Sequence, residues 1–137
     1  MKLLEEKIVS DGKVLNGSVL KVGSFLNHQM DVAFLNKLAE EFYKTFRDCG
    51  VTKVLTIEAS GIGIACLTAQ FFNCPMVFAK KGKTSNINND VYCCPVESFT
   101  HNTTYNVMVE KEFLKKDDCV LIIDDFLAKG QAVLGLL

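Results

Sequence analysis

The sequence KVLTIEASGIGIACLTAQFFNCPMVFAK, residues 53–80, decides the fold class. Branched apolar residues at 53–58 are typical of a buried strand, and the small residues ASGIG then lead into an apolar helix that ends near Asn73. Pro75 interrupts the chain, and MVFAK predicts a second strand. This order favours two parallel strands joined by a right-handed helical crossover, and therefore an α/β fold with a mainly parallel central sheet.

The segments on either side of this unit extend the prediction. A helix is expected from Asp31, a capping residue, to about Cys49, with Gly50 ending it. VLNGSVLKVGSFLNHQM, residues 14–30, favours turns and short extended pieces, with Asn16-Gly17 as a strong turn signal. Residues 82–104 predict a long loop that ends in a hairpin containing TYNVMVEKEFL, and residues 119–123 predict a further buried strand.

Composition limits the classes of protein to consider. The 137 residues suffice for one domain, and 49% of them are apolar. The net charge of −1 gives no overall indication of nucleic-acid binding, although it leaves a local basic patch open. Charges interrupt every apolar run, and Glu5 and Glu6 interrupt the region where a signal peptide would be apolar, so we expect a cytoplasmic protein. The six cysteines lack the spacing of zinc ligands, and Cys66, Cys74 and Cys119 are expected in the core.

An acidic pair marks the first candidate site. In VLIIDDFLAKGQA, residues 120–132, Asp124 and Asp125 end an apolar strand, and a helix is expected to begin near Gly130. Unpaired N–H groups at a helix start bind phosphate, whereas the carboxylates suit hydroxyl groups or a magnesium-bound partner. A sugar phosphate supplies both kinds of group. The alternative is a capping turn with two solvated acids.

A second candidate site follows the first predicted strand. The small residues after Glu58 open a helix at Gly61, where exposed N–H groups suit a diphosphate; a plain tight turn is the alternative. A dinucleotide-binding fingerprint is disfavoured, because Cys66 stands at its third glycine position and Lys80 stands where an acid is required. Lys81 follows the second strand and is a candidate contact to the same diphosphate.

Four segments carry a resemblance to a known family: VLKVGSFLNHQMD, VLTIEASGIG, FAKKGK and VLIIDDFLAKGQA. Together they resemble the type I phosphoribosyltransferases, and within them the bacterial branch specific for xanthine. The resemblance implies that Asp124 and Asp125 bind the ribose of 5-phosphoribosyl 1-diphosphate (PRPP) and act in catalysis. It also implies three further groups of residues. They are the 5'-phosphate loop of Ala128, Lys129, Gly130, Gln131 and Ala132, the diphosphate site of Glu58, Ala59, Ser60, Gly61 and Lys81, and the base site of Leu20 and Asn27.

The implied function is purine salvage, in which xanthine and PRPP give xanthosine 5'-monophosphate and diphosphate, with Mg²⁺ bound by the PRPP and no metal site in the protein. The implied partners are these substrates and a second copy in a homodimer, with neither nucleic acid nor membrane. Residues 1–137 are expected to form a single domain with an N-terminal hood, residues 1–30, and a flexible hairpin loop over the site, and to lack the C-terminal part of the usual domain. Lys129, Gly23 and Ile64 depart from the family pattern.

Two alternatives share this fold. One is a phosphoribosyltransferase for guanine or hypoxanthine. The other is a non-catalytic regulator that responds to purines, although the first fifty residues show no basic segment for binding DNA.

Overall fold

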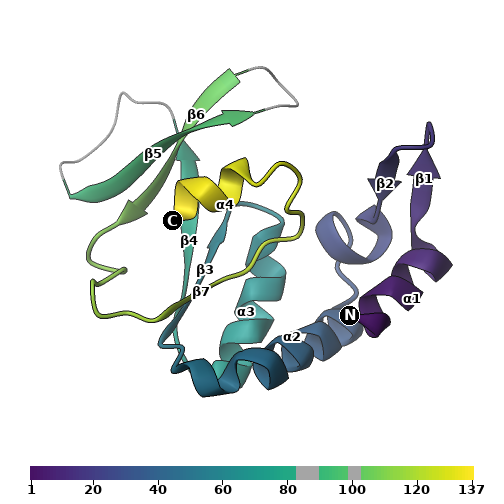
Figure 1. The fold of residues 1–137 in the computed structure, drawn as a ribbon, viewed down its shortest axis with the longest axis horizontal. Helices are drawn as coiled ribbons and strands as arrows, with labels where there is room; N and C mark the ends of the chain where they lie inside the picture. The colour runs from purple at the N-terminus through teal and green to yellow at the C-terminus, as the bar shows by residue number, and fades with distance from the viewer. Residues whose placement is uncertain (83–89, 99–102) are drawn as a thin grey trace.

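A computed structural model describes residues 1–82, 90–98 and 103–137. A five-stranded sheet, in the order β5-β6-β4-β3-β7, has helices on both faces, and a smaller unit with its own two-stranded sheet lies at the N-terminus (Figure 1). The elements are α1 (Lys2–Asp11), β1 (Lys13–Leu15), β2 (Val19–Lys21), the π-helix η1 (Gly23–Asn27), α2 (Val32–Phe46), the 3-10 helix η2 (Arg47–Cys49), β3 (Lys53–Ile57), α3 (Gly61–Phe72), β4 (Met76–Gly82), β5 (Val91–Ser98), β6 (Thr103–Glu110), β7 (Val120–Ile122) and α4 (Gln131–Leu136).

The predicted strand, helix and strand unit is confirmed as β3, α3 and β4. β3 pairs in parallel with β4 on one side and with β7 on the other. Four consecutive residues of β3, Val54 to Ile57, are buried. Their side chains alternate between the two faces of the sheet: Val54 joins the apolar cluster with α2 and α3, whereas Leu55 joins the cluster with β6 and α4. This two-sided burial explains why the strand is almost continuously apolar.

The helix predicted after Asp31 is also confirmed. The Asp31 side chain accepts a hydrogen bond of 3.1 Å from the Phe34 N–H, which caps the first turn of α2. After η2, Gly50 adopts a left-handed conformation with φ of 70° and ends the helical segment. α2 packs its apolar stripe against α3, so both helices cover the same face of the sheet (Figure 1).

The N-terminal unit begins with a helix that was not predicted. Residues 2–11 form α1, in which Leu3, Leu4 and Ile8 gather on one side of the helix and pack against the core. The Asn16-Gly17 turn is confirmed and joins β1 to β2. The buried residues of this unit belong to the same apolar cluster as α2, α3 and Ile123, so the hood rests on the core beside the acidic pair.

The hairpin predicted after β4 is confirmed, because β5 pairs antiparallel with β6, and β6 pairs antiparallel with β4. Its first strand takes up residues 91–98, most of which were expected as loop. β5 is the outer strand of the sheet, where Pro95 is tolerated because an edge strand can spare a backbone donor. The rest of the predicted long loop falls mainly on residues 83–89 and 99–102, which lie outside the described residues.

Two predictions of burial were wrong. β7 lies at the other edge of the sheet and its three residues are only partly buried, although Ile123 directly after it is 5% exposed. Cys66 and Cys119 were expected in the core but are exposed, and Cys74 is partly buried. Cys66 lies on the outer side of α3, which the high overall apolarity of that helix does not reveal.

Candidate active site

The two loops singled out in the sequence meet at the carboxyl ends of the neighbouring strands β3 and β7. β3 and β7 are parallel neighbours, and the Ile123 N–H donates a 2.9 Å hydrogen bond to the Leu55 carbonyl. Their carboxyl ends therefore lie side by side, which places Asp124 beside the loop after β3. The Asp124 carboxylate oxygen Oδ1 lies 3.1 Å from the point where a β-carbon on Gly61 would stand.

Gly61 is required by packing at this junction. It is buried at the first position of α3, and a β-carbon there would overlap the hydroxyl oxygen of Thr56 on β3. The absence of a side chain lets the start of the helix approach both the strand and the acidic pair. Sequence reasoning treated Gly61 as a backbone contact to a ligand, and the structure adds this role in helix-to-strand packing.

Glu58 connects the first loop to the next strand. Its backbone N–H donates to the Ala79 carbonyl at 3.0 Å, and its side-chain oxygen Oε1 accepts a hydrogen bond from the Lys81 N–H. The peptide bond between Glu58 and Ala59 is cis. Glu58 thus acts on Lys81 through the backbone and leaves the ammonium group of that lysine to other partners.

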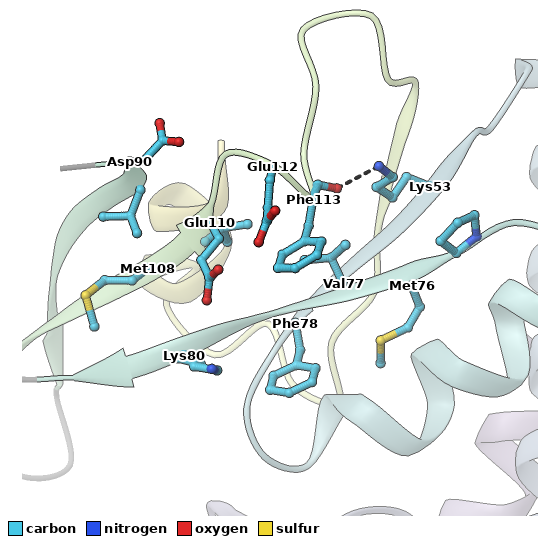
Figure 2. A pocket seen from close by; sticks show the side chains of 13 residues that line it. Lys53, Met76, Val77, Phe78, Lys80, Asp90, Met108, Glu110, Glu112 and Phe113 are labelled. Carbon is cyan, nitrogen blue, oxygen red and sulfur yellow. Dashed lines mark hydrogen bonds between the residues drawn. The ribbon is translucent and has the colours of Figure 1, made fainter. Parts of the chain in front are cut away.

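Lys81 and Lys80 point to opposite faces of β4. The Lys81 ammonium lies 5.5 Å from the centre of the Tyr105 ring on β6, on the face of the sheet that α4 covers. Lys80 lines a surface pocket of about 860 Å³ on the other face, together with Phe78, Met108 and other residues (Figure 2). Only Lys81 therefore faces the acidic pair, as the alternation of a strand requires.

Asp124 is electrostatically unusual. Its partial burial, reinforced by the neighbouring charge of Asp125, raises the pKa of its carboxyl group to about 6, although the Asp125 N–H and the positive charge of Lys81 oppose this rise. The Asp125 N–H donates to Asp124 Oδ1 at 2.9 Å. The site thus holds a carboxylate whose ionised form is poorly solvated and would be stabilised by additional hydrogen-bond donors.

Tyr105 is a site residue that sequence reasoning missed. Burial, and secondarily the negative charge of Asp124, raise the pKa of its phenol. Tyr105 belongs to the antiparallel β6, and no spacing in the sequence connects it to Asp124. Tyr105 is two and four residues from Val107 and Val109, which face α4. This spacing in a strand is the only sequence signal that its side chain points to the same face.

The proposed 5'-phosphate loop has the backbone of a sharp turn. Ala128 and Gly130 adopt positive φ angles of 45° and 76°. The Gly130 N–H donates to the Leu127 carbonyl at 2.7 Å, and α4 then begins at Gln131. The first N–H groups of this short helix have no acceptor within the helix. Ala128 and Lys129 are exposed, so the loop lies at the surface after the acidic pair.

Leu20 and Asn27 lie in the N-terminal hood. Leu20 in β2 is partly buried against the core, and Asn27 is exposed at the end of η1. Across the described ranges, no hydrogen bond joins either residue to the acidic pair or to the loop after β3. Their role in binding the base therefore stays a prediction.

In the part of the chain that the structure describes, no three His, Cys, Asp or Glu side chains are grouped as a metal site would require. Over the same residues, no helix combines the length and the apolar character that crossing a bilayer requires.

Comparison with known proteins first defines the class. The structure is similar to adenine phosphoribosyltransferase from Giardia lamblia, with a TM-score of 0.75 and 21% identity over 97% of this chain and 73% of that one. The enzyme of the same name from Rhodothermus marinus gives a TM-score of 0.72 at 18% identity, over 98% and 76% of the two chains. The fold is that of the type I phosphoribosyltransferases. No family model matches the sequence.

Sequence similarity identifies the family within this class. The chain is 57% identical to xanthine phosphoribosyltransferase from Lachnoclostridium phytofermentans, over 100% of this chain and 71% of that protein. It is 54% identical to the protein of the same name from Ruminiclostridium cellulolyticum, over 99% and 72%, and 51% identical to that from Staphylococcus aureus, over 99% and 71%. The chain belongs to the xanthine phosphoribosyltransferase family.

Proposed function

We propose that the protein transfers the phosphoribosyl group of PRPP to N9 of xanthine and releases xanthosine 5'-monophosphate and diphosphate. The proposal rests on one observation. The loops after β3 and β7 meet at the carboxyl ends of these parallel strands, where the Asp124 carboxylate lies beside the start of α3. Membership of the xanthine phosphoribosyltransferase family supports the choice of base.

Each loop binds one part of PRPP in this proposal. Asp124 and Asp125 accept hydrogen bonds from the ribose hydroxyls, because carboxylates repel the phosphates but suit hydroxyl donors. The loop 128–132 binds the 5'-phosphate through backbone N–H groups other than that of Gly130, which already donates to the Leu127 carbonyl. The loop 58–61 binds the diphosphate through the N–H groups that follow Glu58, whose own N–H is bonded to the Ala79 carbonyl, and Lys81 adds a positive charge.

The chemistry requires positioning and charge rather than a covalent intermediate with the protein. As the bond between the anomeric carbon and diphosphate breaks, positive charge develops on the sugar. The carboxylates of the acidic pair stabilise that charge, and Lys81 stabilises the negative charge on the departing diphosphate. Holding the base and the sugar in line supplies the rest of the rate enhancement. The partial burial of Asp124 strengthens these electrostatic interactions.

The hood formed by residues 1–30 is proposed to cover the base. Leu20 would pack on the flat face of the purine, and the side-chain amide of Asn27 would pair with its polar edge. The support is that the buried residues of the hood belong to the same apolar cluster as Ile123, which directly precedes the acidic pair.

Magnesium fits this site as a companion of the substrate. Mg²⁺ prefers oxygen ligands and retains several waters, and it is commonly held by phosphates with one or two carboxylates nearby. The diphosphate would supply its main ligands, while the acidic pair contributes negative charge close by. When bound, the ion neutralises the diphosphate as a leaving group.

We also propose a cytoplasmic homodimer that binds neither nucleic acid nor membrane. The six cysteines are free thiols, as expected in a reducing compartment, and the net charge is −1. The dimer follows from the family resemblance, and sedimentation or size-exclusion measurements test it.

The function is tested by incubating the purified protein with PRPP and Mg²⁺ and with xanthine, guanine, hypoxanthine or adenine in turn. We expect xanthosine 5'-monophosphate as the main product. Preferential turnover of guanine or hypoxanthine would assign a different base. Binding of PRPP and purine without turnover would instead support a regulator of the same fold.

A further inference from the structure

Thr56 is a buried polar residue without a partner in the described structure. It is 0% exposed, and its hydroxyl is the one buried side-chain polar atom, among the described residues, that makes no hydrogen bond. Thr68, equally buried on α3, donates its hydroxyl to the Ile64 carbonyl at 2.8 Å. A buried unpaired hydroxyl is costly, and such groups in a folded protein call for an explanation. Valine would fill the same position in β3 without this cost.

The position of Thr56 suggests the explanation. It lies on the strand that leads into the diphosphate loop, with its hydroxyl directly beneath Gly61. The Asp124 Oδ1 atom approaches the same place from β7 and lies 3.1 Å from the point that a β-carbon on Gly61 would occupy. Thus the unpaired donor and the partly buried carboxylate adjoin the same glycine. The other charged and titratable groups around Asp124 are Asp125, Lys81 from β4 and Tyr105 from β6.

We propose that Thr56 is a positioning residue for the sugar site, whose hydroxyl donates a hydrogen bond to the Asp124 carboxylate when PRPP binds. This inference rests on the proposed function, because it requires the ribose hydroxyls to engage Asp124. In the free protein, the Asp125 N–H holds Asp124 Oδ1 at 2.9 Å and the Thr56 donor is unused. Both oxygen atoms lie within 3.1 Å of the point that a β-carbon on Gly61 would occupy, so they are close enough for side-chain rotation to bring them together.

The physical consequence is a gain on binding. A carboxylate has room for about four hydrogen bonds, so it can accept the Thr56 hydroxyl together with the sugar hydroxyls. Hydrogen bonds to the ionised form favour it over the protonated form. The burial that raises the pKa of Asp124 would then be offset in the complex. The cost of the unpaired hydroxyl in the free protein would be recovered when the substrate arrives, which strengthens binding.

The test compares Thr56→Val, which replaces the hydroxyl by a methyl group of similar shape, with Thr56→Ser, which keeps the hydroxyl. Thr68→Val is the matched control, because it makes the same change at an equally buried threonine whose hydroxyl already has a backbone partner. Thr56→Ala removes the same hydroxyl if valine is not accommodated. The measurements are PRPP affinity by calorimetry with Mg²⁺ present, the pKa of Asp124 by carboxyl NMR with and without PRPP, and Tm.

We expect Thr56→Val to weaken PRPP binding about tenfold, or about 1.4 kcal/mol. The variant should raise the Asp124 pKa in the PRPP complex but leave it unchanged in the free protein. Its Tm should be no lower than that of the original protein, while Thr68→Val should lower Tm and leave PRPP affinity unchanged. Thr56→Ser should bind within about twofold of the original protein.

The inference is overturned if the folded Thr56→Val or Thr56→Ala variant binds PRPP as tightly as the original protein and shows the same Asp124 pKa in its PRPP complex. That result would leave the proposed function intact. Failure of the original protein itself to bind PRPP would overturn both. A loss of affinity in Thr56→Ser as large as in Thr56→Val would assign the effect to packing and would also reject the inference.

Discussion

The backbone N–H of Lys81 donates a hydrogen bond to the side-chain carboxylate of Glu58. This contact connects the loop after β3 to the outer part of β4, and it leaves the Lys81 side chain directed toward Tyr105 and the acidic pair. The sequence analysis placed Glu58 and Lys81 together in the diphosphate site. In the structure their roles differ, because Glu58 orients the strand β4 whereas the ammonium of Lys81 supplies positive charge.

Replacement of Glu58 tests the first role. Glu58→Ala removes the acceptor and should weaken PRPP binding several-fold, because an ordinary hydrogen bond contributes about 1 kcal/mol. Glu58→Gln keeps an acceptor oxygen at the same place and should bind PRPP nearly as well as the original protein. Calorimetric titration of PRPP with Mg²⁺ measures both. An equal loss in the two variants would show that the charge of Glu58, and not its hydrogen bond, is required.

The two adjacent lysines provide a matched pair for the second role. Lys81→Met should weaken PRPP binding about tenfold or more, since a charge-assisted contact to phosphate contributes about 1.5–3 kcal/mol. It should also raise the pKa of Asp124 further, because the charge of Lys81 lowers that pKa. Lys80→Met makes the same change on the opposite face of β4 and should alter neither quantity (Figure 2). A similar loss of affinity in both variants would contradict the assignment.

Asp124 should destabilise the free protein at neutral pH. A carboxyl group whose pKa is about 6 when folded, against 3.8 as its usual value, binds protons more tightly in the folded state. Stability therefore falls as the pH rises between these two values and stays reduced above about pH 6. Asp124→Asn should then be more stable than the original protein by about 1 kcal/mol near pH 7.5, after allowance for partial solvent screening.

This gain in stability should disappear near pH 4, where residue 124 is uncharged in both folded proteins. PRPP binding by Asp124→Asn should be lost or severely weakened. Thermal unfolding at both pH values, together with PRPP titration, checks the prediction. Lower stability of the variant near pH 7.5 would contradict it, because the ionised carboxylate would then be well satisfied in the free protein.

Gly61 and Gly63 make a pair of predictions about packing. A methyl group at Gly61 would overlap the Thr56 hydroxyl and lie 3.1 Å from Asp124 Oδ1, so Gly61→Ala should destabilise the fold by about 2 kcal/mol and impair PRPP binding. A methyl group at Gly63 meets only the end of the flexible Met30 side chain, which is 37% exposed and can move away. Gly63→Ala should therefore cost little, and chemical denaturation of the two variants measures the difference.

Much of the core architecture was predictable because its signals are local. The apolar strand at 53–57, the capping residue Asp31 and the apolar stripe of α2 each follow from residues close together in the chain. The strand β5 was not predictable in this way. Its sequence contains Pro95 and follows a polar segment, and it becomes a strand because β6, some ten residues later, supplies the hydrogen-bonding partner.

Helix α1 was missed for a different reason. Leu3, Leu4 and Ile8 have a spacing that a helix would place on one side, but the charged residues between them hide the pattern in so short a segment. Contact with the core, and the ion pairs from Lys7 to Asp11 at 2.7 Å and to Asp31 at 2.9 Å, hold α1 in place. The hood thus depends on contacts between residues distant in the sequence.

The residues alone identified the acidic pair, the loop after it, and the loop that opens α3, because each follows a strand end at a short and recognisable spacing. The spatial arrangement determined the rest: that Asp124 adjoins Gly61, that Tyr105 comes close to Lys81, and that Thr56 is left without a partner. These relationships join residues from four different strands or strand ends. Burial, electrostatic interaction and unmet hydrogen-bonding capacity depend on distances in space, and so they appear only once the strands are paired in the sheet.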